Sequence, residues 1–211
     1  MIDRHILPML SRVLSPVAGG LVRLGATADA ITAVGLCLGL AAAGLIAAGQ
    51  YQAGLAAFIA NRLCDGLDGA VARRLGPTDR GAFIDIAGDF VIYAALPFGF
   101  AWADPASNAL AAAALLFGFM GTASSFLGFA IIAAKRGMTS AAYPTKGFYY
   151  LGGLTEGSET IGFFVTVCLW PGWFGPLAWG FGGLCALTTV TRWVGGIAAF
   201  KPAPPAPPPD D

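Results

Sequence analysis

Four aspartates lie inside apolar stretches of this 211-residue chain, at spacings that place each pair on one face of a helix. Asp65 and Asp68 are three residues apart, and Asp85 and Asp89 are four residues apart, so the members of each pair are neighbours on a helix surface. An ionisable residue inside a membrane span costs at least ~2.5 kcal/mol on insertion scales, which makes each a candidate functional residue. The four aspartates are therefore the first candidates for a site.

These carboxylates predict a metal centre. Together they bring a charge of about −4 into a medium of low dielectric constant, which protonation or bound cations must relieve. Two divalent cations would balance this charge, and hard carboxylate oxygens with no His or thiolate ligand set suit Mg²⁺ or Mn²⁺ better than zinc. Two such ions on phosphate oxygens are a common arrangement for phosphoryl transfer.

A second set of charges lies in later apolar stretches. Glu156 and Glu159 are three residues apart, and Arg192 lies in the last stretch. The depth of a residue in its helix can be counted at about 1.5 Å per residue from the nearest charged residue at the helix end expected on the cytoplasmic side. This count gives roughly 13 to 15 Å for Asp65, Asp89, Glu156 and Arg192. We expect all these charges to line one polar cavity. For the glutamates and Arg192, a structural Glu–Arg pair between two helices is the alternative.

Small residues and an arginine accompany the aspartates. Gly69 and Gly81 would let a ligand approach the backbone closely, although glycines that pack helices together are common in membranes. Arg73, one turn after Gly69, is placed to meet a pyrophosphate at the membrane edge. It could equally be a charge that sets membrane topology.

The composition indicates a bilayer as the solvent for these residues. Only 11% of the residues are charged, 56% are hydrophobic, and the formal net charge is zero, with a mean hydropathy of +0.70. A soluble domain usually carries about a quarter of its residues as charges. The sequence therefore predicts an integral membrane protein, and the absence of a basic face argues against nucleic acid as a partner.

Six apolar stretches are long enough to cross a bilayer as tilted helices. They cover residues 30–50, 52–74, 81–103, 107–134, 147–170 and 172–200. Residues 1–24 carry apolar side chains at helical spacing, which predicts an amphipathic helix on the membrane surface. We expect an all-α integral membrane fold with six transmembrane helices in one domain over 1–200, followed by a disordered proline-rich tail over 201–211.

The basic residues predict the orientation. Lys and Arg precede the first span, lie between the second and third and between the fourth and fifth, and follow the sixth, whereas the other three turns contain none. Positive charges concentrate on the cytoplasmic side of membrane proteins. Both chain ends and the acidic layer are therefore expected on that side.

The acidic stretches also match a known pattern. The run Asp65-Gly-Leu-Asp68-Gly69-Ala-Val-Ala72-Arg73, followed by Gly81-Ala-Phe-Ile-Asp85-Ile-Ala-Gly-Asp89, resembles the signature of the CDP-alcohol phosphatidyltransferase family. That signature is D-x-x-D-G-x-x-A-R, a spacer, and G-x-x-x-D-x-x-x-D, and its eight fixed positions are all present. Thr27-Ala-Asp29-Ala-Ile-Thr32 resembles a weaker form of the family's T-P-N-x-L-T motif. The spacer from Arg74 to Arg80 is one residue shorter than usual.

The resemblance implies an enzyme of phospholipid biosynthesis in a bacterial inner membrane, working as a homodimer. It would transfer a phosphatidyl group from a CDP-linked lipid such as CDP-diacylglycerol to a small alcohol and release CMP. The four aspartates would hold two Mg²⁺ or Mn²⁺ ions, and Asp89 would also take the proton of the acceptor hydroxyl. The contacts to the CDP moiety would come from Gly69, Ala72, Arg73 and Gly81. The pocket of the acceptor alcohol would be lined by Glu156, Glu159 and Arg192.

Two other classes of membrane protein also place carboxylates within helices. A secondary transporter could use them as a cation or proton relay, but this explains neither the glycines nor the Ala-Arg positions. A membrane prenyltransferase also binds a pyrophosphate through Mg²⁺ held by aspartates, but the D-G-x-x-A-R link and the small number of spans disfavour it. The acceptor alcohol is left open, and the glutamate pair favours a neutral or amine-bearing one.

Overall fold

The computed structural model describes residues 3–138 and 153–200, and these two ranges are almost entirely helical. The elements in chain order are α1 (Asp3–Arg23), α2 (Ala28–Ala47), α3 (Tyr51–Leu75), α4 (Asp79–Ala103), α5 (Pro105–Lys135), α6 (Gly157–Leu169), the 3-10 helix η1 (Pro171–Trp173) and α7 (Phe174–Ala199). No β-strand occurs within the described ranges. The prediction of an all-α fold is confirmed.

Local signals in the sequence set the ends of the first helices. The side chains of Thr27, Thr78 and Asp104 each accept a hydrogen bond from a backbone N–H three residues later, at the starts of α2, α4 and α5. Such caps satisfy N–H groups that have no partner within the helix. Gly76, with a φ of 99°, ends α3. The helices α2 to α5 agree with the first four predicted spans to within three residues.

The fifth predicted span, 147–170, begins too early. Residues 153–156 are not helical and α6 starts at Gly157, while 147–152 lie outside the described residues. Glu156 and Glu159 form a capping box, in which each side chain bonds the backbone N–H of the other residue. This motif marks the first turn of a helix. Glu156 therefore precedes its helix, so the count of helical residues on which its predicted depth rests does not apply.

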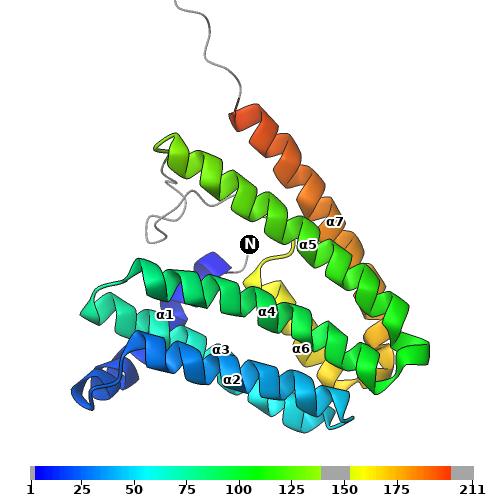
Figure 1. Cartoon of the computed structure of the whole chain (residues 1–211), viewed down its shortest axis with the longest axis horizontal. Helices are drawn as coiled ribbons and strands as arrows, with labels where there is room; N and C mark the ends of the chain where they lie inside the picture. The colour runs from blue at the N-terminus through cyan, green and yellow to red at the C-terminus, as the bar shows by residue number, and fades with distance from the viewer. Residues whose placement is uncertain (1–2, 139–152, 201–211) are drawn as a thin grey trace, which may run out of the picture.

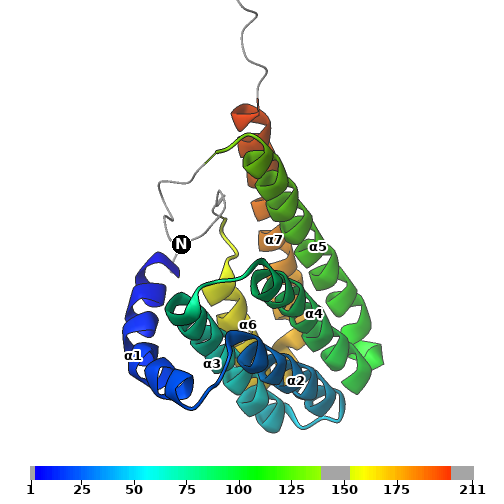
Figure 2. The same cartoon turned by 60° about the vertical axis from the view of Figure 1, so that its left-hand side comes forward.

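The helices form two groups. The helix α2 packs against both α3 and α4, α1 lies across α3, and α5 and α7 run side by side (Figure 1). The two groups meet where α4 contacts α5, and α6 contacts both α3 and α7 (Figure 2). Because α2 contacts both α3 and α4, it can form the floor of a space between them.

Small residues allow these close contacts. A Cβ atom added at Gly99 of α4 would lie 2.6 Å from the carbonyl oxygen of Ala43 in α2. A Cβ atom at Gly118 of α5 would lie 3.0 Å from the carbonyl oxygen of Gly182 in α7. Backbones that approach this closely at small residues are typical of helix pairs in membranes.

Within residues 3–138 and 153–200, three helices, α2, α4 and α5, are long and apolar enough to cross a membrane. The helix α3 carries charges along its second half, and α6 has only 13 residues. On α1, Val13 and Val17 are exposed, while Ala18 is buried against α3 with Ala70 and Val71. The six-span topology and the position of α1 on a membrane surface stay predictions, and the tail over 201–211 lies outside the described residues.

Candidate active site

A cavity between α3 and α4 contains the four signature aspartates, and α2 forms part of its wall. Asp65 and Asp68 reach it from α3, and Asp85 and Asp89 from α4. The other lining residues are Thr32, Gly35, Leu36, Asn61, Arg62, Gly88 and Ile92. The expectation that the helical spacings would bring both pairs to one site is met.

Three of the four aspartates form a tight cluster. Asp65, Asp68 and Asp85 each offer a carboxylate oxygen, and these three oxygens lie within 4.8 Å of one another. Like charges so close together repel strongly unless cations or protons separate them. Oxygen ligands alone, with no imidazole or thiolate in the cluster, suit a hard cation such as Mg²⁺ or Mn²⁺. The donor set therefore fits the predicted metal.

Asp68 is the most deeply placed member of the cluster. Its residue is only 6% exposed, and the hydroxyl of Thr32 on α2 donates a hydrogen bond of 2.6 Å to its Oδ2 atom. A hydroxyl that holds a carboxylate in place also fixes the direction of its remaining lone pairs. Thr32 thus ties α2 to the acidic cluster of α3.

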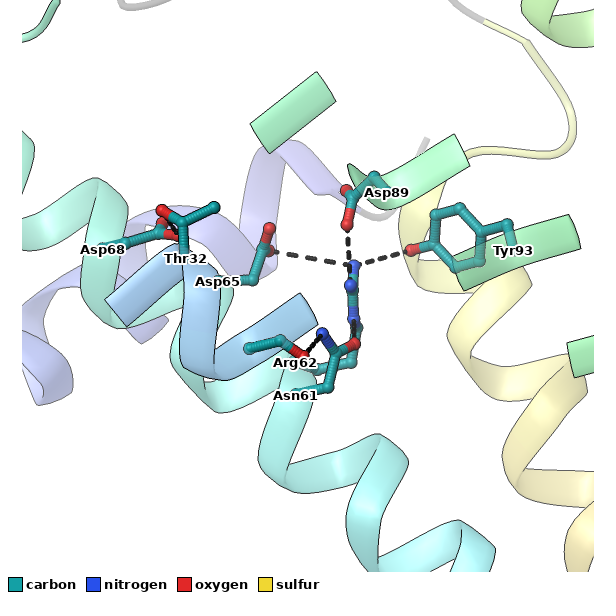
Figure 3. Close-up of polar contacts among 8 residues, drawn as sticks. Thr32, Asn61, Arg62, Asp65, Asp68, Asp89 and Tyr93 are labelled. Atoms are coloured by element: carbon teal, nitrogen blue, oxygen red, sulfur yellow. Dashed lines mark hydrogen bonds and ion pairs between the residues drawn. The ribbon is translucent and has the colours of Figure 1, made fainter. Parts of the chain in front are cut away.

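The fourth aspartate, Asp89, has a different partner. Its Oδ1 atom accepts a hydrogen bond of 2.7 Å from Nη2 of Arg62 on α3. The side chain of Arg62 is only 9% exposed, and its Nη1 atom lies 4.0 Å from Oδ2 of Asp65 (Figure 3). Arg62 therefore offsets one of the four negative charges and contacts one aspartate of each pair, Asp65 and Asp89.

Arg62 is not among the predicted site residues, although two signals in the sequence point to it. It is a charged residue inside an apolar stretch, which is itself a reason to expect function. It also lies three residues before Asp65, hence on the same helix face. Tyr93, four residues after Asp89 and bonded to Arg62 through its hydroxyl, was missed as well.

The residues predicted to contact CDP lie near the ends of α3 and α4. Gly69 and Ala72 are half-buried and Arg73 is exposed in the last turns of α3, while Gly81 is in the first turn of α4. A Cβ atom at Gly81 would lie 3.1 Å from Oδ1 of Asp29. These four residues thus lie on the side of the aspartates nearest the loop between α3 and α4.

The basic residues around Arg73 have partners within the protein. Arg74 donates hydrogen bonds to the carbonyl and hydroxyl oxygens of Ser15 on α1. Arg80 forms an ion pair with Asp29. These contacts hold α1 and the start of α2 to the helices that carry the site.

Glu156, Glu159 and Arg192 do not line the cavity of the aspartates. Arg192 donates a hydrogen bond of 3.0 Å to the carbonyl oxygen of Thr122 on α5, and its guanidinium lies over the ring of Phe126. Glu156 accepts a hydrogen bond from the backbone N–H of Gly153 in addition to its capping bonds. Among the described residues, these three charges therefore form a second polar group beside Gly153, whose N–H bonds Glu156 and whose added Cβ atom would lie 3.2 Å from Nη2 of Arg192. The expectation of a single cavity for all the buried charges is not met there.

Known proteins are similar to this chain in sequence. Inner membrane protein YnjF of Escherichia coli is 52% identical over 95% of this chain and 98% of its own length. Phosphatidylinositol phosphate synthase of Mycobacterium marinum is 39% identical over 94 residues, which are 44% of this chain and 40% of that protein.

Solved structures of Mycobacterium tuberculosis phosphatidylinositol phosphate synthase have the same fold. The complex with manganese and citrate gives a TM-score of 0.72 at 25% identity, covering 90% of this chain and 93% of that one. The form with CDP-DAG bound gives 0.70 at 24% identity, covering 92% and 99%. The sequence model for CDP-alcohol phosphatidyltransferases matches residues 26–193, which include all four aspartates. This chain therefore belongs to the CDP-alcohol phosphatidyltransferase family of enzymes.

Proposed function

We propose that this protein transfers a phosphatidyl group from a CDP-linked lipid such as CDP-diacylglycerol to an alcohol and releases CMP. The observation that carries the proposal is the convergence of Asp65, Asp68 and Asp85 within 4.8 Å, with Asp89 beside them in the same cavity. The related synthase of Mycobacterium tuberculosis with CDP-DAG bound supports a CDP-lipid as the donor. Family membership favours this enzyme over the transporter.

The acidic cluster holds divalent cations, two in number, which we take to be Mg²⁺ or Mn²⁺. The manganese complex of the related synthase supports this assignment. When bound, such ions neutralise charge on the phosphate oxygens and on the leaving group. The contribution of Asp65, Asp68 and Asp85 is to hold the cations in the cavity, with Thr32 fixing the carboxylate of Asp68.

Asp89 acts both as a ligand and as the base. In the reaction, the acceptor oxygen forms a bond to the phosphorus that carries the diacylglycerol, and the bond from this phosphorus to the oxygen of CMP breaks. The proton of the acceptor hydroxyl goes to a carboxylate oxygen of Asp89. A positioned carboxylate that removes a proton in the transition state contributes typically about 10²- to 10⁴-fold to the rate.

The CDP moiety lies against the ends of α3 and α4. Gly69, Ala72 and Gly81 offer little side-chain bulk there, and Arg73 is exposed, whereas Arg74 and Arg80 are bonded to Ser15 and Asp29. Arg73 is therefore the basic residue best placed to bind the pyrophosphate. The acyl chains extend between helices into the bilayer.

The proposed topology follows from the charge pattern. Residues 1–200 form one membrane domain of six spans, with α1 on the membrane surface and both chain ends and the active site on the cytoplasmic side. The inner-membrane relative in Escherichia coli supports the membrane location. We further propose a homodimer, as the family resemblance implies.

The second polar group is the proposed acceptor pocket. Glu156, Glu159 and Arg192 would bind a neutral or amine-bearing alcohol. We expect Glu159→Gln to raise the KM of the alcohol roughly tenfold, because a hydrogen bond to a charged group is lost, while the KM of the CDP-lipid stays unchanged. Gln preserves the capping box, so the melting temperature should also stay unchanged. Steady-state kinetics with each substrate varied measures both KM values.

A purely structural role for Glu159 gives a different pattern. In that case Glu159→Gln has wild-type kinetics, and only Glu159→Ala, which breaks the capping box, lowers the stability, by about 1 kcal/mol. That result would remove Glu159 from the acceptor pocket. Thermal unfolding of both variants in detergent distinguishes the two roles.

The reaction itself is tested by CMP release. Purified protein is incubated with CDP-diacylglycerol, Mg²⁺ or Mn²⁺ and a panel of alcohols that includes glycerol phosphate, inositol phosphate, serine and choline. We expect CMP to appear with one class of alcohol and only when a divalent cation is present. Turnover without metal would contradict the metal-dependent mechanism.

A further inference from the structure

Arg62 is a charged residue of the active-site cavity that the signature of the family does not include. It faces both acidic pairs from α3: its Nη2 atom lies 2.7 Å from Oδ1 of Asp89, and its Nη1 atom lies 4.0 Å from Oδ2 of Asp65. Arg62 is thus placed to influence which of the four carboxylates bind cations and which one takes the acceptor proton.

The position of Arg62 is fixed from several sides. Its Nε atom donates to Oδ1 of Asn61 at 2.7 Å, and its Nη1 atom donates to the hydroxyl of Tyr93 at 3.0 Å. Asn61 in turn donates to the carbonyl oxygen of Gly35 at 2.8 Å. The guanidinium also lies over the rings of Phe58 and Tyr93, at 5.8 and 5.1 Å from their centroids.

These contacts join three helices into one polar network. Gly35 belongs to α2, Asn61 and Arg62 belong to α3, and Asp89 and Tyr93 belong to α4 (Figure 3). A buried arginine with its donors engaged in this way keeps one orientation. The Arg62 side chain therefore presents Nη2 to Asp89 from a fixed point.

Asp89 differs from the other three aspartates in its position and in its partner. Oxygens of Asp65, Asp68 and Asp85 gather within 4.8 Å of one another, and Asp89 is outside this group. Asp89 is held by the guanidinium through Oδ1. The arrangement leaves three carboxylates as the main cation cluster and one carboxylate with a separate orientation.

We propose that Arg62 is a positioning residue: by binding Oδ1 of Asp89 it leaves one carboxylate oxygen of Asp89 for the cations, and it holds the side chain in the orientation from which Asp89 takes the proton of the acceptor alcohol. This inference rests on the proposed function. Arg62 makes no bond to a reacting atom and acts through Asp89. Without Arg62, both oxygens of the Asp89 carboxylate turn toward the cations, and Asp89 is a poorer base for the acceptor.

Two measurements on Arg62→Gln test the proposal. We expect kcat to fall about 100-fold, the typical cost of displacing a catalytic group by about 1 Å, with the KM of CDP-diacylglycerol unchanged. We also expect Mn²⁺ to bind roughly fivefold more tightly in the absence of substrates, because a cation beside the cluster is gone and a carboxylate is released to it. Isothermal titration calorimetry measures this affinity independently of activity.

A coupling experiment separates positioning from a general structural role. If Arg62 acts through Asp89, the gain in Mn²⁺ affinity on replacing Arg62 by Gln is smaller when Asp89 is already Asn. Equal gains in the two backgrounds would overturn the proposal, because they would show that the charge alone matters. Arg136→Gln is the matched control. Like Arg62, Arg136 lies over an aromatic ring, that of Phe200, and it bonds the carbonyl oxygen of the same residue. Its loss should change neither kcat nor metal affinity.

Arg62→Lys is the second variant, used if Arg62→Gln does not fold. Lysine retains the charge but lacks the fork that bonds Asn61, Tyr93 and Asp89 together, so we expect kcat to fall about tenfold with wild-type lipid binding. Wild-type kcat in either variant overturns the proposal. If the wild-type protein itself releases no CMP, the proposed function fails instead, and the two failures are distinguishable.

Discussion

Asp89→Asn is expected to lower turnover by about 10³-fold while CDP-diacylglycerol still binds. The amide has nearly the same shape as the carboxylate and can still accept a hydrogen bond from Arg62, but it cannot take the proton of the acceptor hydroxyl. Loss of a general base typically costs about 10²- to 10⁴-fold. CMP release gives the rate, and equilibrium binding of labelled CDP-diacylglycerol gives the affinity.

A second Asp→Asn change provides the control for this result. Asp104 caps the N-terminus of α5, outside the cavity that holds the signature aspartates, and Asn is an equally good cap. Asp104→Asn should therefore keep both the turnover and the melting temperature of the wild type. Near wild-type turnover in Asp89→Asn would remove Asp89 as the base.

Asp68→Asn should remove cation binding together with turnover. Asp68 is the most buried member of the acidic cluster, and Asn offers one neutral oxygen in place of a charged carboxylate. We expect the affinity for Mn²⁺ to fall more than about 100-fold, which exceeds the 10- to 100-fold typical of losing a residue behind a ligand. Calorimetric titration with Mn²⁺ and CMP release at increasing Mn²⁺ measure the two effects.

Thr32→Val should weaken Mn²⁺ binding less than Asp68→Asn does. Valine matches threonine in shape but cannot donate the 2.6 Å hydrogen bond to Asp68, so Mn²⁺ affinity should fall about 10- to 100-fold, and excess Mn²⁺ should restore turnover. Excess Mn²⁺ should not restore Asp68→Asn. Unchanged Mn²⁺ affinity in Asp68→Asn would show that the cluster is not the metal centre.

The acidic site was predictable because local spacing and helix geometry determine it. Residues three or four apart share a helix face, and apolar stretches with clear capping residues set the limits of α2 to α5. Asp65 with Asp68, and Asp85 with Asp89, therefore had to project together from two consecutive helices. How tightly the four would gather depends on tertiary contacts, and the spacing alone did not separate Asp89 from the other three.

The errors have specific physical causes. A metal centre follows from the carboxylates alone, so their spacing does not predict the neutralising charge of Arg62 on the same helix face. The apolar composition continues through residues 147–155, where no charge or proline marks a later start, and this predicts a helix that already includes Glu156. The pair Glu156 and Glu159 at N-cap and N3 spacing was the available signal for the true start at Gly157.

The release of CMP from CDP-diacylglycerol, measured with and without a divalent cation across a panel of alcohols, tests the central claim most directly. The arrangement of Asp65, Asp68, Asp85 and Asp89 predicts CMP formation that requires both Mg²⁺ or Mn²⁺ and an acceptor alcohol, and that is lost in Asp68→Asn and Asp89→Asn. CMP formation that persists after the metal is removed with a chelator, or that is unchanged in both variants, would contradict it.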